Sequence, residues 1–98
     1  MTPKHILFFF STLLITLTLQ AQKKTKVASI GDSVTEGYGI ENREKNAYPA
    51  ELNRLLGSAY EVKNFGHSGA TLLRHGHHPY HKTRQFTEAL TYNADIAI

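Results

Sequence analysis

The sequence has no cysteine, no tryptophan and a single methionine among its 98 residues. Without cysteine it can form no disulfide, no thiolate zinc site, no thiol nucleophile and no lipid-modified N-terminal cysteine. It also lacks a strong charge of one sign, because 11 Lys and Arg stand against 8 Asp and Glu, a formal net charge of +3. A nucleic-acid surface needs clustered basic residues, and these are scattered, so we expect no nucleic-acid partner. The apolar share of 41% is typical of a globular chain, here one small domain or part of a larger one.

A long apolar run is missing as well. Residues 6–19 are apolar apart from Ser and Thr, and at about 1.5 Å per residue they would span about 21 Å, short of the roughly 30 Å hydrocarbon core of a bilayer. Lys4 precedes this run and the small residue Ala21 follows it. A charged start, a short apolar centre and a small-residue end predict a secretory signal peptide over residues 1–21, cleaved near Ala21. We therefore expect residues 22–98 to be exported to the periplasm or the exterior, with no membrane attachment after cleavage.

Strand and helix patterns alternate along the rest of the chain. Residues 27–30 (VASI) form a short β-prone run that Gly31 closes. A helix is predicted to open near Ala47, with Pro49 in its first turn and Gly57 as its stop. Its apolar side chains recur at helical spacing and form an apolar stripe on one face: Tyr48, Leu52, Leu55 and Leu56.

The second half of the chain repeats this alternation. Residues 60–64 alternate as a strand and lead into a glycine-rich turn, and residues 83–92 fit a second helix. Residues 95–98 resemble a third strand, whereas residues 43–45 (REK) are expected in an exposed loop. Strands separated by helices predict an α/β class with a parallel sheet. Parallel sheets are normally covered on both faces and rarely this small, so we expect about three strands and two helices of a truncated domain.

Residues 31–37 (GDSVTEG) directly follow the first strand. In parallel sheets ligands bind beyond the carboxyl ends of the strands, and a serine at such a turn exposes its hydroxyl beside backbone N–H groups. Ser33 is therefore a candidate nucleophile. Two alternatives stay open: Ser33 and Glu36 also fit a capping box, and the glycines could cradle a phosphate, although G-x-G-x-x-G and Gly-Lys-Ser/Thr are both absent.

Two sequence blocks resemble the GDSL or SGNH hydrolase family. Gly31-Asp32-Ser33, with Gly37 four residues on, is similar to the family's first block, and residues 64–71 (NFGHSGAT) are similar to its second. A Tyr-Pro pair opening the first helix, here Tyr48-Pro49, is also typical of these enzymes. The resemblance covers residues 26–98. It implies a flavodoxin-like three-layer α/β/α parallel sheet, the SGNH hydrolase fold, with residues 22–98 forming its N-terminal part.

The resemblance also implies roles for individual residues. Ser33 would be the nucleophile, and its own N–H and that of Gly69 would form the oxyanion hole. Four residues would support the two turns: Gly31, Asp32, Asn64 and Gly66. The family needs no cofactor. Its Gly-x-Asn-Asp block and its Asp-x-x-His block, which supplies the base, do not occur in the sequence, so the resemblance implies an incomplete fragment.

The implied activity is that of an exported serine esterase that hydrolyses carboxylic esters through an acyl-enzyme. Export and the family's range favour acetyl esters on carbohydrates, so the implied partner is a small-molecule or glycan ester. A lysophospholipase or thioesterase of the same family, and a non-catalytic secreted remnant, are the alternatives.

Four histidines crowd one loop: His75, His77, His78 and His81. Gly76 and Pro79 prevent a regular helix there, and no carboxylate lies within the cluster. We therefore expect no metal site and interpret the loop as solvated or facing substrate. His67, inside the second block, is a candidate pocket residue.

Overall fold

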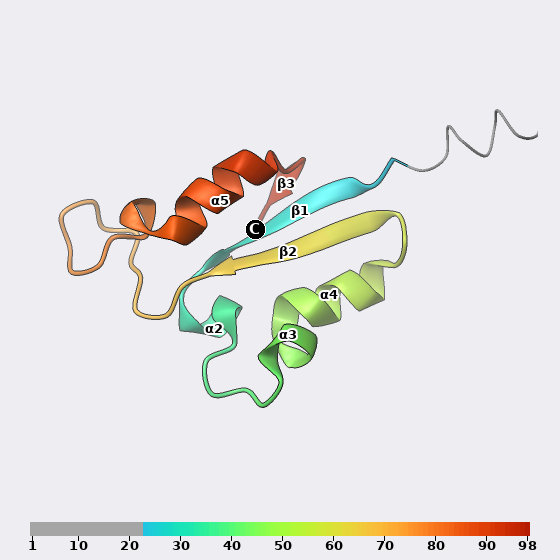
Figure 1. The fold of residues 1–98 in the computed structure, drawn as a ribbon, viewed down its shortest axis with the longest axis horizontal. Helices are drawn as coiled ribbons and strands as arrows, with labels where there is room; N and C mark the ends of the chain where they lie inside the picture. Colours follow the sequence, from blue (N-terminus) through green and yellow to red (C-terminus); the bar gives the residue numbers. More distant parts are fainter. Residues whose placement is uncertain (1–22) are drawn as a thin grey trace, which may run out of the picture.

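The computed structural model describes residues 23–98, and Figure 1 shows their arrangement. The expected signal peptide lies outside the described residues. The elements follow in the order β1 (Thr25–Gly31), α2 (Ser33–Glu36), α3 (Arg43–Asn46), α4 (Tyr48–Leu56), β2 (Tyr60–Gly66), the 3₁₀ turn η1 (Tyr80–Lys82), α5 (Arg84–Tyr92) and β3 (Ile96–Ala97). Within residues 23–98, none of the helices combines the length and apolarity that a bilayer crossing requires.

The three strands form one parallel sheet in the order β2-β1-β3. The register of β1 against β2 runs from Thr25 opposite Tyr60 to Gly31 opposite Gly66, so the two strands end level with each other. The loops that follow them therefore start at the same edge of the sheet. The described chain is a small α/β unit with a three-stranded parallel sheet, as the alternating pattern predicted.

Helices cover both faces of this sheet (Figure 1). On one face Tyr92 of α5 packs on Phe65 of β2, with ring centroids 5.5 Å apart. On the other face α4 is joined to β2 by the Asn53 side chain, whose Oδ1 accepts a hydrogen bond from the Val62 N–H at 2.9 Å. The centre of β1 is consequently buried on both sides, as a parallel sheet requires.

The predicted helix ends are confirmed at both long helices. Pro49 lies fully buried in the first turn of α4, and Gly57 at φ +81° ends that helix. Thr83 caps α5, because its hydroxyl oxygen accepts a hydrogen bond from the Phe86 N–H at 3.2 Å. Local sequence thus set both boundaries, since caps depend on residues within one turn of the helix end.

The apolar stripe of α4 is not uniformly buried, because Leu55 is 78% exposed and packing against the sheet is carried by the first turn and by Asn53. One expectation was wrong. Residues 43–45 belong to the one-turn helix α3 rather than to a loop, because the Asn42 carbonyl accepts from the N–H groups of Lys45 and Asn46. Their exposure is as expected.

Candidate active site

The first turn carries Ser33 at the start of α2, directly after β1. Asp32 is the N-cap of this helix, since its Oδ1 accepts a hydrogen bond from the Val34 N–H at 3.1 Å. Ser33 is the first helical residue and is half-buried, and among residues 23–98 its hydroxyl makes no hydrogen bond. The capping-box alternative does not hold, because Asp32 provides the cap and the Glu36 carboxylate bonds elsewhere.

The second turn follows β2 and lies beside the first. The His67 N–H donates to the Gly31 carbonyl at 2.9 Å, which continues the pairing of the two strands into their loops. The Ala70 N–H then donates to the His67 carbonyl at 3.1 Å and closes a tight turn. Gly69 is the third residue of that turn, with φ +85°, a conformation that glycine adopts without steric cost. The structure thus brings the Ser33 turn and the Gly69 turn to the same edge of the sheet.

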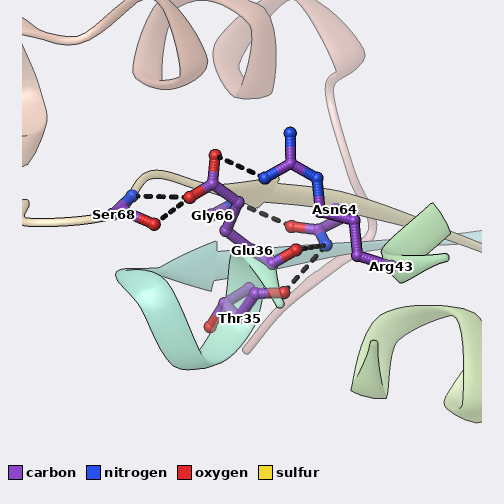
Figure 2. Close-up of polar contacts among 6 residues, drawn as sticks. All are labelled: Thr35, Glu36, Arg43, Asn64, Gly66 and Ser68. Carbon is purple, nitrogen blue, oxygen red and sulfur yellow. Dashed lines mark hydrogen bonds and ion pairs between the residues drawn. The ribbon is translucent and has the colours of Figure 1, made fainter. Parts of the chain in front are cut away.

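Asn64 ties these two segments together through its side-chain amide (Figure 2). Its Nδ2 donates to the Thr35 carbonyl at 2.8 Å, and its Oδ1 accepts from the Gly66 N–H at 2.8 Å. A second, longer contact of 3.4 Å runs from Nδ2 to the Glu36 carbonyl. Asn64 therefore satisfies carbonyl groups at the end of α2 that have no partner within so short a helix.

Gly66 allows the close approach of α2 to β2. A Cβ atom at this position would lie 2.8 Å from the Thr35 carbonyl carbon and 2.9 Å from the Glu36 Cα, and closer still to the Glu36 nitrogen. All three atoms are backbone, so they cannot turn away as a side chain would. At Gly31 the added Cβ would instead meet the Thr35 side chain. Both glycines are needed because Thr35 and Glu36 pack directly on the strand ends.

Glu36 is the residue that the sequence analysis missed. Its Oε2 accepts hydrogen bonds from both the backbone N–H of Ser68, at 3.0 Å, and the Ser68 hydroxyl, while its Oε1 lies 3.6 Å from Arg43 Nη1 (Figure 2). The bond from the Ser68 hydroxyl, with help from Arg43 and His67, lowers the pKa of Glu36. The carboxylate is therefore charged at neutral pH. The sequence suggested only a capping-box role for Glu36. Its contact with Ser68 could not be predicted, because the two residues are 32 positions apart and form no local sequence pattern.

A cavity of about 450 Å³ opens beside both turns. It is lined by residues 30–32, residues 70–72 and Tyr80. Tyr80 is buried, and its hydroxyl donates to the Phe65 carbonyl at 2.6 Å, so its ring is fixed as one wall. The lining is mainly apolar with the Asp32 turn at one side. Such a space suits a small organic group rather than an ion.

The His-rich loop is held at its base. The Thr71 N–H donates to the His78 carbonyl at 3.1 Å, and the Tyr80 N–H donates to the Thr71 carbonyl at 2.8 Å. His78, at φ +60°, packs against His67 with ring centroids 4.8 Å apart and the rings tilted by 42°, and it lies beside Gly69. No group of three or more His, Cys, Asp or Glu within residues 23–98 is arranged to hold a metal ion.

One known protein with clear sequence similarity is an acetylxylan esterase of Xylanibacter ruminicola. The two sequences are 44% identical over 73 residues, which is 74% of this chain and 15% of the esterase. The chain thus spans about 15% of the length of this relative. No family model matches the chain. No solved structure matches it either.

Proposed function

We propose that residues 22–98 are the N-terminal part of an SGNH-type serine ester hydrolase, with the flavodoxin-like α/β/α fold of that family. The adjacency of the Ser33 turn and the Gly69 turn carries this proposal. They start at the level ends of β1 and β2 and are joined by the His67 N–H bond to the Gly31 carbonyl. The strand order β2-β1-β3, with α4 and α5 on opposite faces, supports the fold.

In this proposal Ser33 is the nucleophile. Its hydroxyl oxygen attacks the ester carbonyl carbon, a general base takes the hydroxyl proton, and the oxyanion accepts hydrogen bonds from the N–H groups of Ser33 and Gly69. When the tetrahedral intermediate collapses, the C–O bond to the alcohol breaks and the base returns the proton to the leaving alcohol. Water then hydrolyses the acyl-enzyme by the same route. No cofactor takes part.

The general base is not among the residues assigned so far. The 98 residues contain neither Gly-x-Asn-Asp nor Asp-x-x-His, the blocks that supply a further donor, the base and the residue that orients it. We assign these groups to other parts of the whole protein, and the greater length of the relative supports this. A non-catalytic secreted binding module is the alternative if the whole protein contains neither block.

The relative's name suggests the substrate class. We propose that the whole protein removes acetyl groups from a carbohydrate, as the name of the acetylxylan esterase describes for that enzyme. A lysophospholipase or thioesterase activity is the alternative within the family. Export through the signal peptide of residues 1–21 would bring the enzyme to an extracytoplasmic glycan.

The test is hydrolysis of p-nitrophenyl acetate by the protein expressed from its complete open reading frame. Ser33→Ala should lower kcat by roughly a millionfold, as loss of a serine nucleophile does in other serine hydrolases. Ser58→Ala, at an exposed turn before β2, is the matched control and should leave the rate unchanged. Equal rates for Ser33→Ala and the parent would refute the assignment. Acetate release from acetylated xylan, compared with hydrolysis of a long-chain ester, separates the two substrate classes.

A further inference from the structure

Glu36 joins two segments that are 32 residues apart in the sequence. Both oxygens of its carboxylate are engaged, Oε2 by the two donors of Ser68 and Oε1 by Arg43. The side chain is only 23% exposed, whereas that of Arg43 is 52% exposed. Hydrogen bonds to a carboxylate that is partly shielded from water are stronger than bonds between neutral groups. Ser68 is consequently held by a charged and oriented acceptor on α2.

The residue after Ser68 is Gly69, whose N–H is proposed above as an oxyanion donor. Within residues 23–98 this N–H donates to no carbonyl, although the groups on either side of it are fixed. The Ser68 N–H is held by Glu36, and the Ala70 N–H is held by the His67 carbonyl at 3.1 Å. A free N–H between two anchored neighbours is the arrangement that a pre-oriented donor needs. Without these anchored neighbours, the backbone at Gly69 would have wide conformational freedom, because glycine has no side chain to restrict it.

We propose that Glu36 is a positioning residue, whose carboxylate clamps Ser68 to α2 and thereby fixes the direction of the Gly69 N–H relative to Ser33. The proposal rests on the function proposed above and extends it. Ser33 and Glu36 stand on the same single turn of helix, so one short element carries the nucleophile and sets the donor. The Ser68 hydroxyl is then a part of the clamp and is not available as a second nucleophile.

If the contact between Glu36 and Ser68 only stabilised the fold, a different result would be expected. Loss of such a contact would lower the free energy of unfolding and the amount of folded enzyme, but it would not change the kcat of the enzyme that is folded. A clamp that orients an oxyanion donor acts on the transition state, so it changes kcat and leaves KM nearly unchanged. A loss of kcat in the folded enzyme, with KM unchanged, therefore distinguishes a positioning role of Glu36 from a purely structural one.

The experiment uses the protein from its complete open reading frame, with p-nitrophenyl acetate as the substrate and active enzyme corrected for the folded fraction. Glu36→Ala removes the clamp and should lower kcat by about 10- to 100-fold with KM within about twofold, because the donor is displaced rather than deleted. Glu36→Gln keeps an acceptor oxygen and should recover most of that loss. Ser68→Ala removes the hydroxyl and keeps the N–H bond, so its kcat should lie between these values. Glu44→Ala on α3, exposed and with no side-chain partner among the described residues, is the control.

Backbone amide resonances provide a second measurement that does not need activity. In the protein from its complete open reading frame, Glu36→Ala should shift the Ser68 amide proton upfield and speed its hydrogen exchange, while Glu44→Ala should not. An unchanged kcat in Glu36→Ala, with Ser33→Ala inactive, would overturn the clamp and leave the esterase proposal standing. Full activity of Ser33→Ala would overturn both proposals, and the amide shifts would then show only a structural link.

Discussion

Replacing Gly66 by alanine tests whether the approach of α2 to β2 sets the site. The new Cβ would lie 2.8 Å from the Thr35 carbonyl carbon, where ordinary contacts are 3.4–4 Å. Because the neighbours are backbone atoms, α2 must move away from the strand by roughly 1 Å, and Ser33 must move with it. A displacement of about 1 Å at a reacting group costs on the order of 100-fold in rate. Overpacking of this kind also lowers the free energy of unfolding by about 1–3 kcal/mol.

The assay combines urea unfolding with p-nitrophenyl acetate hydrolysis by the protein from its complete open reading frame. Gly39→Ala is the matched control, because a Cβ there meets no atom within 4 Å and the cost is only backbone strain at φ +80°. That strain amounts to roughly 1–2 kcal/mol and should leave kcat within a factor of about three. If Gly66→Ala kept the kcat of the Gly39→Ala control, the packing of α2 on β2 would not determine the position of Ser33.

Three further changes test the contacts around the site and the sheet. Asn64→Ala deletes the bonds to the Thr35 carbonyl and the Gly66 N–H and should lower the free energy of unfolding by about 1–3 kcal/mol in urea, whereas an unchanged midpoint would contradict the bridging role. The folded pKa of Glu36 lies below its ordinary value of 4.5, so its contribution to stability is present above pH 4.5 and is lost as the pH falls through the lowered value. Glu36→Gln should therefore flatten the acid limb of Tm against pH, and two parallel limbs would count against the charged clamp. Burial raises the pKa of Tyr92 to about 12, so its contribution is present below pH 10 and is lost between pH 10 and about 12. Tyr92→Phe should reduce that alkaline loss relative to the parent, and an identical loss in both proteins would show that other groups cause it.

Local sequence was sufficient for the secondary structure wherever a boundary depends on residues within one turn. Pro49 and Gly57 placed the ends of α4, and Thr83 placed the start of α5. The alternation of strands and helices was also sufficient for the parallel sheet, because connections of this length cross over rather than fold back as hairpins. The same pattern placed the Ser33 turn and the Gly69 turn after the first and second strands, and the fold shows that these two strands are paired and end level, with Gly31 opposite Gly66.

The sequence alone was not sufficient for the contacts between these turns. The spacing of Ser33 and Glu36 is consistent with a capping box as well as with a nucleophile turn. Only the folded chain shows that Asp32 is the cap and that Glu36 binds Ser68. In the same way, helical periodicity placed Leu55 on the apolar stripe of α4, and only the fold shows that this side chain is exposed. Periodicity and capping are short-range preferences that the chain expresses anywhere. The contact of the Glu36 carboxylate with the Ser68 amide depends on the register and separation of elements from distant parts of the chain. No local sequence pattern encodes this register or this separation.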